Sequence, residues 1–292
     1  MGYDYLRCVW EMNEFSKRTN GAEIFSIGES IMEKKIYCIS YGKGEKTLFL
    51  NGAHHGLEYI TSGFLMRFLR EIASANENGC DMLGYDVKIL LERVKLYVVP
   101  MVNPDGVDIA VNGLDITNPH HRRLISMVGI HSFNKVWQAN ARGVDINHNY
   151  DALWSVVEKA PSPTKHGGEY PESEPETRAV CDFVRSNNFD MLMAFHSQGG
   201  EIYYDFDGLA SENDRRLAEK MSEESGYPVR NPEGSASFGG LKDWFIKEFG
   251  KTGFTVEMGK GKNPLPEERI AEFFEENAKI ILIAMSHLAM GK

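Results

Sequence analysis

The sequence has few cysteines, no excess of positive charge and no long hydrophobic run, and each absence excludes a class of protein. Its four cysteines, Cys8, Cys38, Cys80 and Cys181, form no C-x-x-C pair. This spacing argues against a disulfide framework and favours individually buried thiols in a reducing compartment. The formal net charge of −10 argues against a nucleic-acid partner, because binding a phosphate backbone requires a basic face.

Long apolar stretches are also missing. The longest apolar run, "IILIAM" from Ile280, is too short to cross a bilayer. The N-terminal stretch "MGYDYLRCVWEMNEF" has no unbroken apolar core, so it does not resemble a secretion signal. We therefore expect a protein without a membrane segment that works in the cytoplasm; an exported form whose leader has been removed is the alternative.

What the sequence does contain is an alternation of strand-like and helix-like segments. Four strand-like runs end in turn residues: "KTLFLNGAHH", "VKLYVVPMVNPDG", "DMLMAFHSQGG" and "TGFTVEMGKG". Apolar residues at three- and four-residue spacing predict helices over residues 59–75, 176–187 and 267–289. This alternation predicts an α/β fold whose sheet is covered on both faces. No repeat or linker interrupts it, so we expect one domain over residues 1–292.

Polar residues with metal-binding chemistry follow these strands. His55, Asn103, His196 and Glu257 all fall at predicted carboxyl ends of strands, where ligands gather in such sheets. Catalytic zinc commonly takes two histidines and a carboxylate. One histidine of the pair His54–His55, together with Glu58 and His196, would supply that set. Either His54 or His55 shares a helix face with Glu58, so spacing alone leaves both open.

Each of these side chains also has an ordinary structural interpretation. The two adjacent histidines could cap the following helix, His196 could be a hydrogen-bonded turn residue, and Glu257 could be a satisfied strand carboxylate. Single short motifs often match by accident. Four such residues at four successive strand ends are harder to explain by chance, so we favour a metal site.

Six motifs in order give the chain a resemblance to the zinc carboxypeptidase family, typified by carboxypeptidase A, over nearly its whole length. They are "HGLE", "NPDG", "GVDINHNYD", "YPESEPETRAV", "FHSQGG" and "FTVEMG". The resemblance implies a three-layer α/β/α fold with a mixed, mostly parallel sheet of about eight strands. It also implies one Zn²⁺ per chain held by His55, Glu58 and His196, with Glu257 as the catalytic base.

Two positions depart from that family. The family's oxyanion arginine follows a tryptophan, but this chain reads "WQANARGVD", with Gln138 in that place. Arg142, four residues further on, either takes over the catalytic role or is an ordinary surface arginine. The family's Asn-Arg pair, which clamps a peptide's C-terminal carboxylate, is here Asn147–His148. Histidine cannot form the two-pronged guanidinium contact.

Such departures resemble one branch of the family, the bacterial γ-D-glutamyl–diaminopimelate peptidases that cut cell-wall peptides. The resemblance implies a peptide or muropeptide substrate, with Asn147, His148 and Gln138 among the substrate-binding residues. Lys242 falls where the family reads side-chain specificity. It either binds a substrate carboxylate or points to solvent, and we favour solvent slightly.

Two rival functions remain. One is a conventional carboxypeptidase that removes C-terminal residues and uses Arg122, Arg123 or Arg142 as its carboxylate clamp. The other is a zinc-containing relative that binds peptides without cutting them. The base Glu257 speaks against the second, because a binding protein needs no proton acceptor beside its metal.

Overall fold

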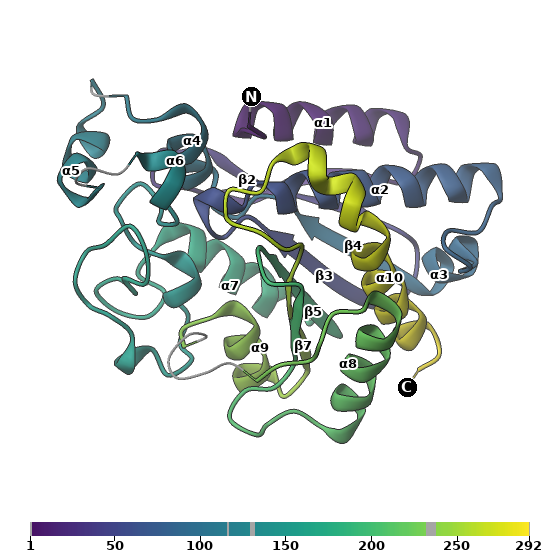
Figure 1. The fold of residues 1–292 in the computed structure, drawn as a ribbon. Coiled ribbons are helices and arrows are strands. Elements are labelled where there is room, and N and C mark those ends of the chain that lie inside the picture. The colour runs from purple at the N-terminus through teal and green to yellow at the C-terminus, as the bar shows by residue number, and fades with distance from the viewer. Residues whose placement is uncertain (1, 116, 129–131, 232–237, 292) are drawn as a thin grey trace.

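The computed structural model describes residues 2–115, 117–128, 132–231 and 238–291. Within this part of the chain, strands and helices are interspersed along the sequence (Figure 1). The strands are β1 (Glu23–Glu29), β2 (Lys35–Tyr41), β3 (Lys46–Gly52), β4 (Val94–Val99), β5 (Met191–His196), β6 (Glu201–Tyr203) and β7 (Thr252–Glu257). The helices are α1 (Tyr5–Arg18), α2 (Ile60–Asn78), α3 (Val87–Arg93), α4 (Pro104–Asn112), α5 (Pro119–Val128), α6 (Phe133–Val136), α7 (Pro175–Asn187), α8 (Glu212–Ser225), α9 (Leu241–Phe249) and α10 (Ile270–Ala289).

The strands form one mixed sheet in the order β1-β2-β4-β3-β5-β7-β6. The four central strands, β4, β3, β5 and β7, run parallel, whereas β1, β2 and β6 pair antiparallel at the two edges. The mixed sheet agrees with the prediction, although the described residues form seven strands rather than about eight and parallel pairing is confined to the centre. The carboxyl ends of β3, β5 and β7 therefore lie together along the same side of the sheet, where the parallel strands end.

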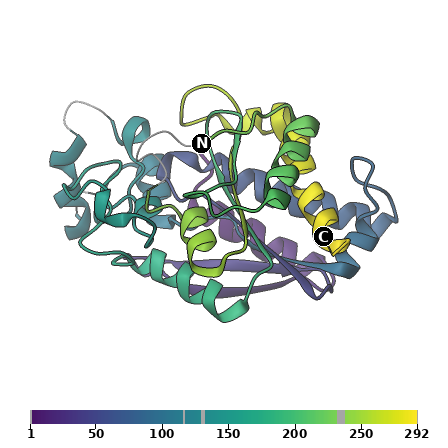
Figure 2. The same cartoon turned by 90° about the horizontal axis from the view of Figure 1, so that it is seen from below.

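Both faces of the sheet are covered by helices, and β5 shows why. Along this strand, Met191, Met193 and Phe195 pack into one apolar cluster, which also contains buried residues of α1, α2, α8 and α10. The alternate residues Leu192 and Ala194 pack into a second cluster, with residues of α7 and α9. Successive strand side chains point to opposite faces, so a continuous apolar strand is buried on both sides. Figure 2 shows the resulting layers.

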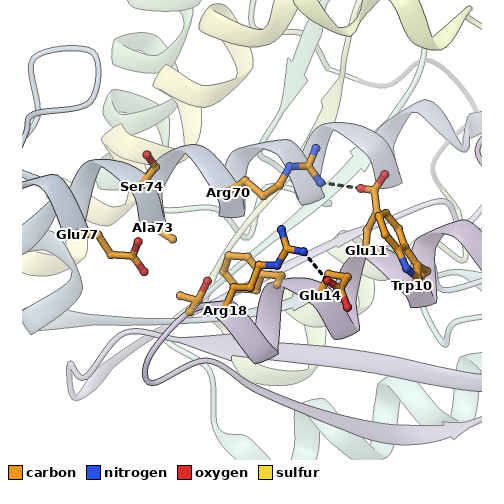
Figure 3. A pocket seen from close by; sticks show the side chains of 10 residues that line it. Trp10, Glu11, Glu14, Arg18, Arg70, Ala73, Ser74 and Glu77 are labelled. Carbon is orange, nitrogen blue, oxygen red and sulfur yellow. Dashed lines mark hydrogen bonds and ion pairs between the residues drawn. The ribbon is translucent and has the colours of Figure 1, made fainter.

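A surface pocket of about 360 Å³ lies between α1 and α2, where Trp10 is 63% exposed (Figure 3). Four of its charged side chains are paired with one another: Arg18 with Glu14, and Arg70 with Glu11. The α2 residues in this pocket begin twelve positions after Glu58, or roughly 18 Å along a helix at 1.5 Å per residue. The pocket is therefore remote from the strand ends that carry the predicted site.

Among the described residues, none of the helices is both long enough and apolar enough to cross a membrane.

Candidate metal centre

The first two predicted ligands lie on a tight turn directly after β3. His55 precedes the 3₁₀ turn η1 (Gly56–Glu58), and Glu58 ends it. The turn is pressed against the start of α4, where a Cβ atom on Gly56 would lie 2.3 Å from the carbonyl oxygen of Gly106. Only glycine fits this close backbone approach. The packing fixes the turn so that both ligand side chains project from the end of β3.

The other two predicted residues come from neighbouring parallel strands. His196 is the last residue of β5 and Glu257 is the last residue of β7. The two residues lie side by side in the sheet register. Because both are terminal residues of paired strands, their side chains are delivered to the same edge as the turn after β3.

His55, Glu58 and His196 converge on one point. The Nδ1 atom of His55 lies 2.9 Å from Oε1 of Glu58, and the Nδ1 atom of His196 lies 2.9 Å from Oε2 of the same carboxylate. One ligand atom from each residue lies within 4.8 Å of the others. Glu58 and His196 are buried. The carboxylate is thus held between two imidazole nitrogens.

A further carboxylate orients His55. Asp145 Oδ1 lies 3.1 Å from Nε2 of His55, and its Oδ2 accepts a hydrogen bond from the backbone N–H of Lys165. A neutral His55 that donates from Nε2 to Asp145 presents the lone pair of Nδ1 to Glu58. A lone pair facing a carboxylate is repulsive unless a cation lies between the two groups. The geometry therefore requires a proton or a metal ion at this point.

The pKa shifts of His55 and Glu58 both come from the opposite charges that face each other across this site. Burial opposes a charge on His55, but the carboxylates of Glu58 and Asp145 hold its pKa well above the usual range. Burial likewise opposes a charge on Glu58, but His55 and His196 lower its pKa to about 2. A largely buried set of two imidazoles and one carboxylate that attracts positive charge matches the donor set of a catalytic zinc site. The residues present thus fit a zinc ion.

Glu257 lies beside this set in a different electrostatic setting. Burial raises its pKa well above the usual range, and the negative charges of Glu58 and Glu201 raise it further. Glu201 is the cross-strand neighbour of Glu257 on β6. A carboxyl group close to a cation site is placed to accept a proton and later return it, and a raised pKa strengthens its hold on that proton.

The structure separates Gln138, which stands in the place of the family's oxyanion arginine, from Arg142. Gln138 lies next to the turn η1, since its backbone carbonyl accepts a hydrogen bond from the N–H of Gly56 at 3.0 Å. The side chain of Arg142 is 52% exposed, and its Nη1 lies 3.6 Å from Glu174. Arg142 and Arg123 line a separate pocket of about 470 Å³. None of the three candidate ligands, His55, Glu58 and His196, is among its lining residues.

Asn147 and His148 are both engaged with the segment around α9. The side-chain oxygen of Asn147 accepts from the backbone N–H of Leu241 at 3.2 Å. His148 is buried and donates from Nδ1 to the carbonyl oxygen of Phe238 at 2.6 Å. Residues 232–237, between Asn231 and Phe238, lie outside the described part of the chain. His148 therefore has only Nε2 left for another contact.

Lys242 corrects one of our expectations. The favoured solvent-facing position is wrong, because the side chain is only 3% exposed. Its ammonium donates to the carbonyl oxygen of Asp205 and pairs with Asp243. A buried lysine requires such partners, and they come from a distant loop and from the next residue. In this conformation the charge of Lys242 is already compensated within the protein.

His54, which spacing alone could not exclude, is not part of the converging set. It is fully buried and its Nε2 lies 3.0 Å from the hydroxyl of Tyr150. Its ring stands 5.6 Å from that of His196, centre to centre. His54 thus packs beside His196 and is not one of the candidate metal ligands.

Three contacting residues were missed by sequence reasoning. Asp145 lies inside the motif "GVDINHNYD", so the motif contained a signal for it. Ser197 donates its backbone N–H to Glu58 at 3.2 Å. The Nδ2 atom of Asn263 lies 3.4 Å from Oε1 of Glu58, 205 residues away in sequence, and no local pattern pointed to that contact.

Comparison with known proteins places this geometry in context. The family model described as "Zinc carboxypeptidase" matches residues 11–280. Gamma-D-glutamyl-L-diamino acid endopeptidase 1 of Lysinibacillus sphaericus is 33% identical over 288 residues, which span 97% of this chain and 72% of that protein. Carboxypeptidase B of Canis lupus familiaris is 25% identical over 96% of this chain and 68% of its own length.

Solved structures share the fold. Bovine thrombin-activatable fibrinolysis inhibitor, in complex with tick carboxypeptidase inhibitor, has a TM-score of 0.80 at 21% identity and covers 100% of this chain and 99% of its own. Murein-tripeptide amidase MpaA from Escherichia coli O157 has a TM-score of 0.55 at 23% identity, with 92% of each chain covered. These similarities confirm the predicted α/β fold.

Proposed function

Because this chain belongs to the zinc carboxypeptidase family, we propose that it uses one zinc ion, held by His55, Glu58 and His196, to hydrolyse γ-D-glutamyl–diamino acid bonds in cell-wall peptides. The observation that carries the zinc site is the convergence of two imidazole Nδ1 atoms on opposite oxygens of Glu58. The substrate class rests on the 33% identity to an endopeptidase of that specificity. Residues 1–292 act as one catalytic domain in this proposal.

The residues around the zinc ion carry out the proton transfers. When bound, zinc supplies Lewis-acid chemistry that acidifies a water molecule and polarises the substrate carbonyl. Glu257 takes a proton from the water as the water oxygen bonds to the carbonyl carbon of the substrate. Glu257 then returns the proton to the leaving nitrogen as the C–N bond breaks. The second proton of the water passes from the new carboxylic acid to the amine, so that a carboxylate and an ammonium group leave the site. Asp145 keeps Nδ1 of His55 available throughout by accepting from Nε2.

The charge on the substrate oxygen needs a hydrogen-bond donor, and we assign this role to Gln138 rather than to Arg142. The backbone of Gln138 contacts Gly56, which adjoins the ligand His55, and its side chain is half-buried. Arg142 instead faces Glu174 and the separate pocket. An amide N–H is a suitable oxyanion donor because it requires no charge.

The absence of a guanidinium at position 148 supports a substrate other than an ordinary C-terminal peptide. His148 offers at most one N–H to a substrate, since Nδ1 is bound to Phe238. An arginine would offer a planar fork matched to a carboxylate. We propose that Asn147 and His148 contact the diamino acid residue, and that Lys242 reaches the substrate only if it leaves Asp243.

The free cysteines support a reducing compartment such as the cytoplasm. Cys8, Cys38 and Cys181 are buried and Cys80 is exposed, each as a free thiol. Exposed thiols persist where the surroundings keep them reduced. In this proposal the substrates are cell-wall peptides that have entered the cell.

The test is a comparison of two substrates with zinc-loaded protein. We expect turnover of L-Ala-γ-D-Glu-diaminopimelate to exceed turnover of a blocked C-terminal dipeptide, measured as kcat/KM by release of free amine. Faster turnover of the dipeptide would instead indicate a conventional carboxypeptidase. The Glu257→Gln variant should bind zinc as the wild type does and lose about 10²- to 10⁴-fold in kcat. Full zinc binding without hydrolysis of any peptide by the wild type would indicate a binding protein.

A further inference from the structure

The loop that follows β7 reaches back to the metal centre through one side chain. This loop covers residues 258–266, between β7 and the 3₁₀ turn η4 (Glu267–Arg269). Asn263, half-buried within it, donates from Nδ2 to the carbonyl oxygen of Ser197 at 2.5 Å and accepts at Oδ1 from the Ser197 hydroxyl at 2.9 Å. Its Nδ2 also lies 3.4 Å from Oε1 of Glu58.

These contacts fix the orientation of the amide. A side-chain amide has donors at one end and an acceptor at the other, and Ser197 offers a carbonyl to the first end and a hydroxyl to the second. With the amide reversed, its oxygen would face the Ser197 carbonyl oxygen, and two acceptors repel. The contact to Glu58, at 3.4 Å, is longer than an ordinary hydrogen bond. The Ser197 pairing is therefore what keeps an N–H directed at the ligand carboxylate.

The backbone of the same loop is bonded to the turn that carries His196. Met258 donates its N–H to the carbonyl oxygen of His196 at 2.8 Å, and Gly199 donates to Gly259 at 2.9 Å. Gly200 donates to the carbonyl oxygen of Glu257 at 2.7 Å. These bonds join the ends of β5 and β7, and Asn263 extends the connection as far as Glu58.

We propose that Asn263 is a positioning residue that fixes the Glu58 carboxylate relative to the His196–Ser197 turn and to the base Glu257. The inference rests on the proposed zinc site, because it concerns how the ligands are held. Glu58 Oε2 is oriented by the N–H of Ser197 at 3.2 Å, and Asn263 supplies the matching donor near Oε1. Partners that orient metal ligands typically contribute 10- to 100-fold to metal affinity.

The experiment removes the side chains of Asn263 and Ser197 separately and together. Asn263→Ala deletes both ends of the amide, whereas Ser197→Ala deletes only the hydroxyl that orients it. We expect Asn263→Ala to raise the zinc dissociation constant, measured by chelator competition, about 10- to 100-fold. Its cobalt-substituted form should show an altered visible absorption spectrum, and kcat should fall with KM nearly unchanged. Ser197→Ala should show a smaller change of the same kind, and the double variant should lose less than the product of the two.

Asn78→Ala is the matched control, because Asn78 bonds to its own helix through Ser74 and lies at the end of α2. It should leave zinc affinity, spectrum and kcat unchanged. Wild-type zinc affinity and spectrum in Asn263→Ala would overturn the proposal. So would a loss of kcat without any change in zinc affinity or spectrum, since Asn263 would then act on the substrate. If the wild type itself binds no zinc, the proposed function fails instead.

Discussion

At the scale of the single residue, in our proposal the oxyanion donor is Gln138 instead of an arginine. Gln138 occupies the place of an arginine, and its backbone is bonded to the turn that carries two of the three ligands. Arg142 is more than half exposed and faces Glu174. A neutral donor close to the carbonyl oxygen can replace a charged one if the site is dry, because hydrogen bonds are stronger where water is excluded.

This assignment predicts unequal effects of two alanine variants. Gln138→Ala should lower kcat about 100-fold, in the range found for loss of one oxyanion donor. Arg142→Ala should change kcat by less than about threefold, because the charge removed is exposed. Both are measured at saturating zinc with L-Ala-γ-D-Glu-diaminopimelate. A larger loss in Arg142→Ala would return the role to the arginine.

Single residues also show where sequence reasoning reaches its limit. Spacing placed both His54 and His55 on one face with Glu58, and the family resemblance was needed to choose His55. In the structure, Tyr150 holds His54 away from the carboxylate, a contact 96 residues apart that no local pattern reveals. The burial of Lys242 was missed for the same reason, since its partner Asp205 belongs to a distant loop.

At the scale of elements, α7 is tied to the rest of the molecule by a buried acid. Glu176, in its first turn, accepts from the backbone N–H of Ile31 and from Nδ2 of Asn140, each at 3.2 Å. Burial, reinforced by the charges of Asp105 and Glu174, raises the pKa of Glu176 to about 8. The carboxyl group is therefore mostly protonated in the folded protein at neutral pH.

The raised pKa predicts a pH dependence of stability. Between about pH 4.5 and 8 the folded state keeps the Glu176 proton and the unfolded state has lost it, so the free energy of unfolding falls as pH rises across this window. One such group contributes a slope of about 1.4 kcal/mol per pH unit. Glu176→Gln should remove this slope and gain stability relative to the wild type toward pH 8.

Chemical denaturation at several values from pH 5 to 8.5 would measure the difference between wild type and variant. Any pH-independent free-energy cost of placing an amide at this position changes the free energy of unfolding equally at every pH. The slope of the free energy of unfolding against pH is therefore the diagnostic quantity. Glu275→Gln, on the exposed side of α10, is the matched control and should track the wild type. Parallel curves for Glu176→Gln and the wild type would contradict the prediction.

Elements with continuous apolar sequence were predicted well, and edge elements were not. The predicted strand-like runs contain β3, β4, β5 and β7, of which β4 and β5 are mostly apolar. The helices predicted over 59–75, 176–187 and 267–289 correspond to α2, α7 and η4 with α10. The antiparallel edge strand β1 has no buried residue and β6 has only three residues. Half-exposed or very short strands lack the periodic signal on which sequence reasoning depends.

At the scale of the whole molecule, the metal centre joins distant parts of the chain and its occupancy should stabilise all of them. The ligand atoms come from the segments after β3 and at the end of β5, which are 138 residues apart in sequence. A ligand that binds only the folded state stabilises it by about 2.7 kcal/mol at a hundredfold excess over Kd. The unfolded chain does not hold these three groups together.

Removal of zinc should therefore lower Tm by several degrees, given about 2–4 °C per kcal/mol for domains somewhat smaller than this chain. Differential scanning calorimetry before and after chelation measures the shift, and added Zn²⁺ should reverse it while Mg²⁺ should not. His196→Ala supplies the comparison, because its Tm should not respond to chelation. An equal response in wild type and His196→Ala would place the stabilising ion elsewhere.

The register of β5 and β7 has a consequence for how this protein tolerates changes of length. His196 and Glu257 are lateral neighbours at strand ends, so deleting one residue inside either strand would turn the terminal side chain to the opposite face of the sheet. Insertions between α4 and α7 leave that strand alignment untouched, although the same segment carries Gln138 and Asp145, which contact Gly56 and His55. Changes of length outside the two strands therefore leave His196 and Glu257 side by side.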